Sequence, residues 1–422
     1  HLLEDETLAL FGWYEARQDY ADRTRRLKQA ILFDNRIESV RQQEVRELYR
    51  LPFKVSASSM EAYGACPFKF FMRYGIRPQE RQIWQINLPD IGNLLHKTAE
   101  VFTKQIVEEQ IDLHTVDQQM VEDRVEAIIT EQAQQYKSAM FASGGVNAFL
   151  FNKLRRAAKN AIGMMVQQLK NGIFTIADSE VRFDESGQMS PISLKLPDGE
   201  EVLLRGAIDR VDIYEKDGRR YIKIVDYKTG NKSVDYTNIY YGLNMQLLLY
   251  MQACLNADLQ NTPAGMFYYQ LDNPLFKYEE EPDEEKLDKK MRDEMKLRGI
   301  ATSDAEIIRA IDQNGENLTN MKIKKDGEPA QGANVFSEEE LKALMAHTVR
   351  LTEQFSQEIF SGEIAPRPYI KKDQSNACTY CDYKSICTFD TGFTANQYRN
   401  LEPVGREQIV EKTARSKGVE DA

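Results

Sequence analysis

The 422-residue sequence lacks any uninterrupted apolar run of the roughly 18 residues that a membrane-spanning helix needs. Its N-terminal segment carries charges where a signal peptide has an apolar core. Five cysteines are too few for a disulfide framework in a chain of this length. With only 23 glycines, 13 prolines and 42% hydrophobic residues, the composition excludes a collagen-like or wholly disordered chain. We therefore expect a cytoplasmic globular protein of two or three domains.

Positive charge is also scarce. There are 55 Lys and Arg residues against 66 Asp and Glu, and a formal charge of −11 gives no general attraction to a phosphate backbone. No GxxxxGK[ST] phosphate loop is present, so nothing indicates an ATPase motor. One local exception is the stretch from Glu131 to Asp178, which has no acidic residue between its ends. Its basic residues, which predict either a phosphate-binding surface or a solvated helix face, are Lys137, Lys153, Arg155, Arg156, Lys159 and Lys170.

Hydrophobic periodicity predicts a mixed α/β chain. Three- and four-residue spacing favours helices over much of 2–50 and over 90–110, 150–169 and 244–255, and the residues Ser56, Ala57, Ser58 and Ser59 offer an N-cap for a further helix. Strand-like segments occupy 179–183, 202–214, 220–230 and 264–271. The segment 278–345 is polar and predicts a helical insertion, with six acidic residues between positions 279 and 285 that indicate a solvated loop.

A carboxylate pair follows from one turn. Asp217-Gly218 is a dipeptide typical of two-residue β-hairpin turns. A turn there pairs Ile213 with Ile222 and continues to pair Asp209 with Asp226. Because alternate residues of a strand share a face, the two carboxylates and Lys228 lie on one face beside an apolar patch.

Like charges opposite one another on neighbouring strands are destabilising, so a cation should compensate Asp209 and Asp226. Oxygen ligands favour Mg²⁺ or Mn²⁺. Lys228, two residues beyond Asp226, is placed to orient a metal-bound water or to stabilise an attacked phosphoryl group. The alternative is an ordinary ion pair of one aspartate with Lys228 or Arg210.

Five stretches, taken in order, resemble a known family: SASSMEAYGACPFKFFMRYG, DIGNLLHKTAEVF, RGAIDRVD with IVDYKTG, YYGLNMQLLLY, and CTYCDYKSICTFD. Together they resemble the PD-(D/E)xK nucleases of the RecB type, and most closely the branch formed by the C-terminal nuclease domains of AddB-type subunits. The resemblance implies a restriction-endonuclease-like α/β core, a mixed β-sheet flanked by helices, with helical additions and a four-cysteine iron–sulfur staple. On this basis 1–54 is the helical remnant of a preceding domain, 55–277 and 346–395 form the nuclease, 278–345 is an insertion and 396–422 a tail.

The resemblance also assigns site residues. The imidazole of the GxxxH helix, two aspartates and one main-chain carbonyl hold the metal in such nucleases, and a DxK lysine and a QxxxY helix act beside it. Carried over, the metal ligands are His96, Asp209, Asp226 and the carbonyl of Tyr227, and the catalytic residues are Asp209, Asp226, Lys228, Gln246 and Tyr250. Glu100, one turn after His96, and Glu180, on the preceding strand, are weaker candidates for supporting carboxylates.

The cysteines fit the same branch, in which one cysteine before the core and three after it hold a 4Fe–4S cluster. The matching residues are Cys66, Cys378, Cys381 and Cys387, the last three spaced C-x2-C-x5-C. Four thiolates equally suit structural zinc, and chemistry alone does not choose. Cys254 has the spacing of a buried helix residue.

The function implied is Mg²⁺- or Mn²⁺-dependent exonuclease cleavage of DNA, single-stranded or at duplex ends, in double-strand break repair. In this branch the strand ending 5′ is cut, and an AddA-type helicase–nuclease partner completes a heterodimer, with no membrane involved. Lys69 and Arg73, beside the first cysteine, are candidates to guide the strand. Two alternatives are a stand-alone 5′–3′ exonuclease of the type found in CRISPR adaptation, and a non-catalytic module that binds DNA ends.

Overall fold

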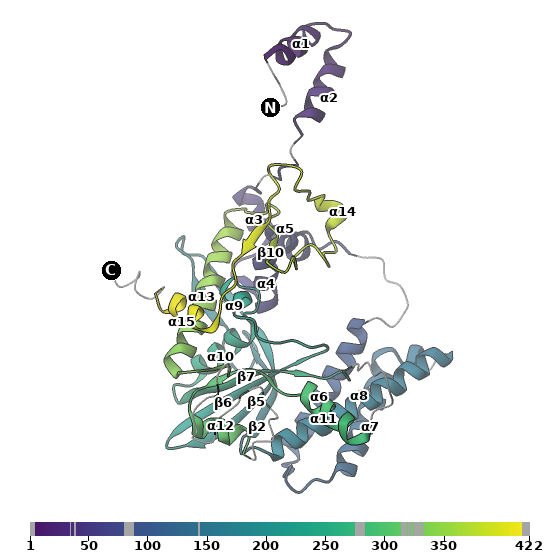
Figure 1. Ribbon diagram of the computed structural model, residues 1–422, viewed down its shortest axis with the longest axis vertical. Coiled ribbons are helices and arrows are strands. Elements are labelled where there is room, and N and C mark those ends of the chain that lie inside the picture. The colour runs from purple at the N-terminus through teal and green to yellow at the C-terminus, as the bar shows by residue number, and fades with distance from the viewer. Residues whose placement is uncertain are drawn as a thin grey trace.

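The computed structural model describes residues 5–33, 35–37, 39–79, 88–141, 144–274, 283–313, 319, 321, 324, 330 and 333–415. Helices lie on both faces of a central β-sheet, and a pair of N-terminal helices projects from one end (Figure 1). No helix within these ranges is both long and apolar enough to cross a membrane. The predicted mixed α/β architecture, a mixed sheet flanked by helices, is confirmed.

The central sheet has six strands in the order β2-β5-β6-β7-β8-β9. The β6–β7 and β8–β9 pairs are parallel, and the other neighbours are antiparallel. The parallel step from β6 to β7 crosses over through helices α9 (Tyr236–Tyr240) and α10 (Gln246–Ala257). The strands are β2 (Thr175–Phe183), β5 (Gly206–Lys216), β6 (Arg219–Lys228), β7 (Asn261–Gln270), β8 (Arg298–Thr302) and β9 (Val335–Phe336).

The β5–β6 hairpin has the predicted register. Asp217 and Gly218 form its turn with φ angles of 51° and 74°, the left-handed values that a two-residue hairpin turn requires. Ile213 then pairs with Ile222, and the ladder runs on to its last pair, Arg210 with Val225. The next residues along the two strands are therefore Asp209 and Asp226.

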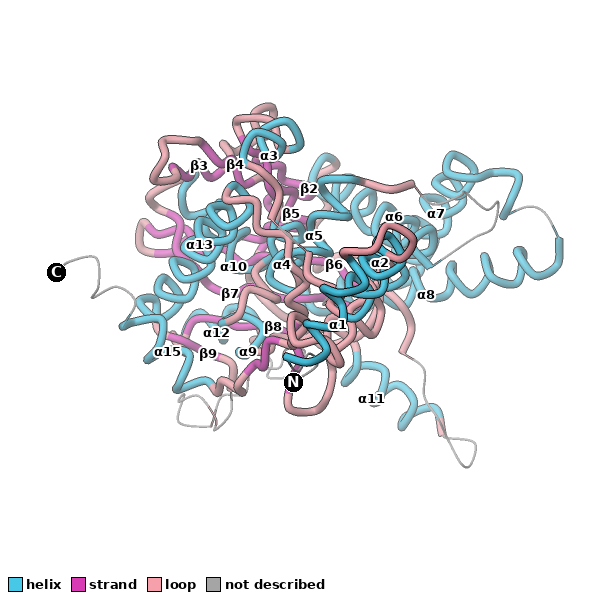
Figure 2. Tube along the Cα trace, turned by 90° about the horizontal axis from the view of Figure 1, so that it is seen from above, coloured by secondary structure: helices cyan, strands magenta, loops and turns pink. Residues whose placement is uncertain are grey.

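Two hydrophobic clusters cover the two faces of the sheet. Ile224 belongs to the first cluster and its neighbour Val225 to the second, as the alternation of a strand requires. The first cluster packs against α4 (Ala57–Ala65), α10 and α13 (Glu338–Phe360). The second packs against α6 (Leu88–Glu108), α7 (Gln118–Phe141), α8 (Gly144–Lys170) and α12 (Ala305–Ile311). In the view from above, the long helices α7 and α8 extend away from the body (Figure 2).

The remaining elements lie around this core. A three-stranded sheet joins β1 (Phe53–Val55), β4 (Glu201–Leu204) and β3 (Ile192–Lys195), and a parallel pair joins β10 (Tyr369–Lys371) to β11 (Arg399–Leu401). The N-terminal helices, predicted from periodicity, are α1 (Asp5–Glu15), α2 (Ala21–Ile31) and α3 (Gln42–Leu48). The other helices are α5 (Pro67–Phe70), the π-helix η1 (Phe71–Ile76), α11 (Glu284–Glu294), α14 (Lys384–Cys387) and α15 (Arg406–Arg415).

Two expectations about strands need correction. The run 202–214, predicted as one strand, is divided: β4 belongs to the small sheet and β5 to the central one. The Arg205 N–H donates to the Val55 carbonyl at 2.9 Å, which ties this junction to β1 rather than to the central sheet. Buried apolar residues lie on both sides of the exposed Arg205, so periodicity alone does not mark the change of sheet.

The segment 278–345, predicted as a polar helical insertion, supplies two strands of the central sheet. It contains α11 and α12, but β8 pairs with β7, and β9 completes the sheet edge. Ile300 and Ile307 are 1% exposed, so part of the segment is core. Much of the acidic run between positions 279 and 285 lies outside the described residues.

Candidate functional site

The predicted site residues meet at the end of β6, where α6 from one helical layer and α10 from the other reach the sheet. Asp209 comes from β5, Asp226 and Lys228 from β6, His96 from α6, and Gln246 with Tyr250 from α10. The hairpin is local in sequence, whereas the two helices arrive from opposite sides. The site is therefore formed only when both layers have packed onto the sheet.

Asp209 lies between the β6 main chain and α6. Its Oδ2 accepts a hydrogen bond from the Tyr227 N–H at 2.5 Å and lies 3.7 Å from His96 Nδ1. Burial raises the pKa of Asp209 well above its usual range, and the charge of Asp226 raises it further. The Asp209 and Asp226 carboxylates are thus close enough to repel each other, as the hairpin register predicts.

Asp226 is 1% exposed and is held on two sides. Gln246 Nε2 donates to its Oδ1 at 2.7 Å and lies 3.0 Å from the Tyr250 hydroxyl, while the Lys228 ammonium contacts Oδ2. The ordinary ion pair weighed from the sequence is therefore present between Asp226 and Lys228. Arg210, the other cation considered, pairs elsewhere.

His96 is held close to both strands. Its ring makes a hydrogen bond to the Tyr227 main chain and packs edge-on against the Tyr227 ring, with centroids 5.8 Å apart. Burial, followed by the Lys228 charge, lowers the pKa of His96, which favours the neutral imidazole that a metal ligand needs. A Cβ atom on Gly92, one turn earlier, would lie 3.3 Å from Thr229 Oγ1, so a small residue lets α6 approach the end of β6.

The donor set suits a hard divalent cation in chemistry, although the side chains now satisfy one another. No three His, Cys, Asp or Glu side chains in the described ranges are grouped closely enough to hold an ion. At present Tyr227 N–H and Lys228 supply the partners of the two carboxylates. Asp226 Oδ2 is buried and has no hydrogen bond, only that ion pair, so an oxygen ligand is available there. In donor type alone, two carboxylates, an imidazole and a nearby main-chain carbonyl suit Mg²⁺ or Mn²⁺.

The two supporting carboxylates are placed differently. Glu100 bonds Lys97 and Lys104 at 2.7 and 2.8 Å, so its hydrogen bonds go to lysines of α6. Glu180 has a left-handed φ of 54° and follows a register shift in β2. Burial raises the pKa of Glu180, and the charge of Glu100 raises it further. Glu180 is also close enough to Asp209 to raise the pKa of that carboxyl.

A buried ion cluster lies on the opposite face of the same hairpin, and the sequence did not indicate it. Arg210 Nε and Lys223 Nζ lie 2.9 and 3.0 Å from the Asp212 carboxylate, and all three residues are at most 4% exposed. Burial opposes the charge on Arg210, but the neighbouring Asp212 raises its pKa overall. The sequence offers one signal for this cluster: β5 has charged residues on both of its faces, although the residues around them are apolar.

The four cysteines of the proposed cluster line one cavity of about 470 Å³. Cys66 follows α4, whereas Cys378, Cys381 and Cys387 come from the C-terminal loop around α14. The β10–β11 pair and a 2.9 Å hydrogen bond from Asn35 to the Thr388 carbonyl anchor this loop.

The thiols of this cavity are near one another. Burial raises the pKa of Cys387 to about 11, and Cys66 contributes in the same direction. Tyr398 hydrogen-bonds Cys378, which partly offsets the rise in its pKa that burial causes. Cys254 is 3% exposed within α10, as predicted for a core residue.

Several basic residues of the stretch between Glu131 and Asp178 contact α7 or the loop before it. Arg155 and Lys159 both contact Glu126 of α7, and Lys170 bonds the Val116 carbonyl. Lys153 and Arg156 are exposed, and so is Arg73, while Lys69 lines the cysteine cavity. The side chain of Lys137 lies outside the described residues. Three of the six basic residues of the stretch, Arg155, Lys159 and Lys170, therefore have partners within the protein.

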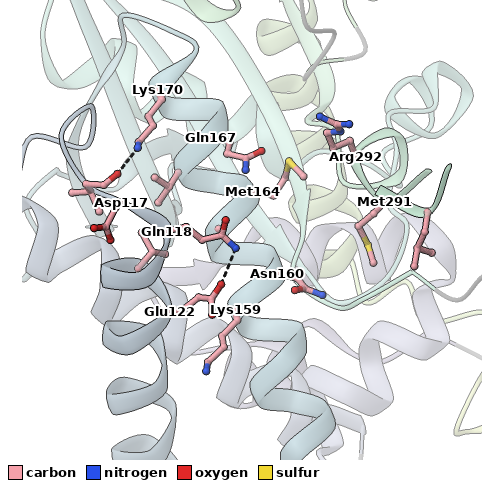
Figure 3. Close-up of a pocket in the computed structure, with 15 residues that line it drawn as sticks. Asp117, Gln118, Glu122, Lys159, Asn160, Met164, Gln167, Lys170, Met291 and Arg292 are labelled. Atoms are coloured by element: carbon pink, nitrogen blue, oxygen red, sulfur yellow. Dashed lines mark hydrogen bonds between the residues drawn. The ribbon is translucent and has the colours of Figure 1, made fainter. Parts of the chain in front are cut away.

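A further cavity, of about 490 Å³, lies between α7, α8 and α11 (Figure 3). The hydrogen bonds drawn there join residues of its own wall, Lys170 to Val116 and Gln118 to Glu122. Among the described residues that line it, none is a histidine or a cysteine. It shares no residue with the carboxylate site.

The sequence matches the model of one known protein family and is similar to several curated proteins. The model of a family described as the PD-(D/E)XK nuclease superfamily matches residues 54–388. A protein of Alkaliphilus oremlandii, named as a subunit of an ATP-dependent helicase/deoxyribonuclease, is 32% identical over 418 residues, which is 97% of this chain and 36% of that protein. The protein with the same name in Clostridioides difficile is 31% identical over 414 residues, 96% of this chain and 36% of that protein. The chain thus spans about a third of the length of the curated relatives it matches.

Proposed function

Because this chain belongs to the PD-(D/E)XK nuclease superfamily, we propose that it hydrolyses phosphodiester bonds of DNA at the carboxylate site. One observation carries the proposal: Asp226 accepts a hydrogen bond from the Gln246 amide on one oxygen and pairs with the Lys228 ammonium on the other. Asp209 and His96 lie directly beside it, 3.7 Å apart. The proposed ligands of a divalent cation are His96, Asp209, Asp226 and the carbonyl of Tyr227.

The protein's own side chains have distinct parts in this mechanism. When bound, the cation would polarise the scissile phosphate and lower the pKa of a coordinated water. Lys228, which pairs with Asp226 Oδ2, would orient that water or stabilise charge on the phosphoryl oxygens. Gln246 holds the other oxygen of Asp226, and Tyr250 holds Gln246. Attack by water is in line, and no covalent enzyme intermediate is required.

Substitution of the central residues tests this function. Asp226→Ala and Lys228→Met should each lower Mg²⁺-dependent cleavage of a labelled DNA strand by about 10²- to 10³-fold, because each removes a group that acts on developing charge. Lys195→Met, at an exposed position of β3, is the matched control and should cleave normally. Full activity of Asp226→Ala would disprove the assignment.

We further propose that the chain is the nuclease part of a helicase–deoxyribonuclease subunit, as its relatives' names suggest. On this view it processes DNA ends in double-strand break repair in the cytoplasm, cuts the strand ending 5′, and works with an AddA-type partner as a heterodimer. Co-purification with that partner would separate this role from a stand-alone 5′–3′ exonuclease. A single-turnover digestion with 5′- and 3′-labelled strands tests polarity, and no cleavage at all would favour a module that only binds DNA ends.

We also propose that the cysteine cavity holds a 4Fe–4S cluster. Four thiols line one cavity of about 470 Å³, and the resemblance to the RecB-type branch favours a 4Fe–4S cluster over a single zinc ion there. The cluster would be a staple joining the two ends of the nuclease core rather than a redox centre. Iron and zinc analysis with an absorption spectrum of anaerobically purified protein tests this assignment.

A further inference from the structure

The carboxylate of Glu61, a residue of α4, caps the N-terminus of α10. Glu61 Oε1 accepts the Met245 N–H at 2.7 Å and the Gln246 N–H at 3.2 Å. Met245 is the N-cap residue of α10, and its own side chain makes no capping hydrogen bond. The first N–H groups of a helix have no partner within the helix, so Glu61 supplies what the local sequence does not.

The capped residue is the one that contacts the catalytic carboxylate. The Gln246 main chain bonds Glu61, while its side chain donates to Asp226 Oδ1 at 2.7 Å. A shift of the first turn of α10 would therefore carry this amide away from Asp226. Glu61 and Asp226 are connected through one residue.

Close packing makes this connection stiff. A Cβ atom on Gly64 would lie 2.6 Å from the carbonyl oxygen of Gly242, so the α4 backbone rests directly on the turn that precedes α10. Ser56 and Ser59 form a reciprocal capping box at the other end of α4. The helix that carries Glu61 is thus fixed at both ends, and Cys66 forms its C-cap.

The charge around Glu61 agrees with this position. Lys232 and Lys228 are its cationic neighbours, and both lie against the Tyr268 ring, with Nζ atoms 4.6 and 5.9 Å from its centroid. Burial raises the pKa of Glu61, and the charges of Lys232 and Lys228 oppose this rise. An uncharged acceptor would keep the cap.

We propose that Glu61 is a positioning residue for the hydrolysis: it fixes the first turn of α10 so that the Gln246 amide holds Asp226 in its productive orientation. This inference rests on the proposed nuclease function. Because Glu61 lies in α4 and Cys66 is the C-cap of that helix, the same contact connects the carboxylate site to the edge of the cysteine cavity.

The test compares kcat and KM for Mg²⁺-dependent cleavage of an oligonucleotide by Glu61→Ala, Gln246→Ala and the double variant. Glu61→Ala should lower kcat by about tenfold with little change in KM, because a small displacement of a positioned group slows chemistry. The double variant should be about as slow as Gln246→Ala alone. Glu61→Gln, which keeps the acceptor oxygen, should recover most of the rate. Multiplying effects in the double variant would overturn the proposal.

A matched control separates positioning from stability. Asp304 Oδ1 accepts the Glu306 and Ile307 N–H groups at the start of α12, the same kind of cap at a distance from the site. Asp304→Ala should lower the unfolding midpoint and leave kcat unchanged. If Glu61→Ala does not fold, Glu61→Asp, which is too short to reach α10, replaces it and should show the same fall in kcat.

Different results would refute the role of Glu61 and the nuclease function on which that role rests. Loss of cleavage in Asp226→Ala with normal kcat in Glu61→Ala would leave the nuclease intact and refute the role of Glu61. Normal cleavage in Asp226→Ala would refute the nuclease site itself.

Discussion

The carboxylate site and the cysteine cavity are both candidate metal centres, yet the protein builds them in opposite ways. At the first site the charged groups are already satisfied by protein: Tyr227 N–H bonds Asp209, and Gln246 and Lys228 hold Asp226. In the second, four thiols face a cavity of about 470 Å³, and burial raises the pKa of Cys66 and of Cys387.

The carboxylate site is thus organised by the protein before a metal binds, whereas the cysteine cavity would be completed by the group that it binds. A polar network can hold catalytic groups near their working positions before a cation binds, and it leaves the cation exchangeable. Neutral thiols attract one another little, so the cavity gains its full stability only with a ligand that favours thiolates. We therefore expect metal removal to affect activity at the carboxylate site and stability at the cysteine cavity.

The largest effect should follow removal of a cysteine of the cavity. A cluster joining Cys66 to Cys378 would close a loop of roughly 310 residues, and the chain-entropy model gives such a link about 6 kcal/mol. Cys378→Ala should therefore lose its iron and much of its free energy of unfolding. Denaturant unfolding of anaerobically purified protein, with iron analysis of the same sample, measures both.

Cys254→Ala is the control for this experiment, because Cys254 is buried in α10 and does not line the cavity. It should keep its iron and lose only about 1 kcal/mol of packing. Equal iron content in the two variants would show that the cavity holds no metal group, and would remove the contrast between the two centres.

Substitution of Asp209 should have a smaller effect on the free energy of unfolding, and should raise it rather than lower it. Burial and the Asp226 charge raise the pKa of Asp209, so its stabilising contribution is complete below the unfolded pKa and is lost as pH rises through the folded pKa. At neutral pH without a cation, Asp209→Asn should therefore stabilise the fold, by about 1 kcal/mol for an opposed like-charge pair. The wild type should gain stability on adding Mg²⁺, and the variant should not.

Asp212→Asn, three positions along the same strand, sharpens this test. Asp212 neutralises Arg210 and Lys223 on the other face, and removing its charge leaves two buried cations without a counter-ion. That variant should lose about 3–5 kcal/mol. Urea unfolding with EDTA or Mg²⁺ compares the two, and destabilisation of both variants alike would mean that Asp209 is a structural ion-pair residue.

The parts of the molecule that were predictable from sequence are those decided by local chemistry. The Asp217-Gly218 turn determines the register of β5 and β6, and therefore brings Asp209 and Asp226 to adjacent positions. Ser56 begins α4 as its composition predicts. Each follows from residues a few positions apart.

What escaped prediction depends on contacts between distant segments. The β8 strand is short and lies within a polar region, so only its pairing with β7 identifies it. The contact of Glu61 with α10 spans 184 positions. The Arg210 cluster requires a strand buried on both faces, and a regular alternation of polar and apolar residues is absent from such strands.

The smallest effect concerns the approach of α6 to the site, which also belongs to the preorganised centre. Gly92→Ala would place a Cβ 3.3 Å from Thr229 Oγ1, so either the Thr229 side chain or α6, which carries His96, must give by a few tenths of an ångström. We expect a fall in kcat of about three- to fivefold, with the free energy of unfolding nearly unchanged, since a 1 Å misplacement costs about 10²-fold. Gly163→Ala on α8, where a Cβ meets no atom within 4 Å, is the control and should leave kcat unaltered. An equal kcat in the two variants would show that the site tolerates movement of α6, and that its geometry depends on the hairpin and α10 alone.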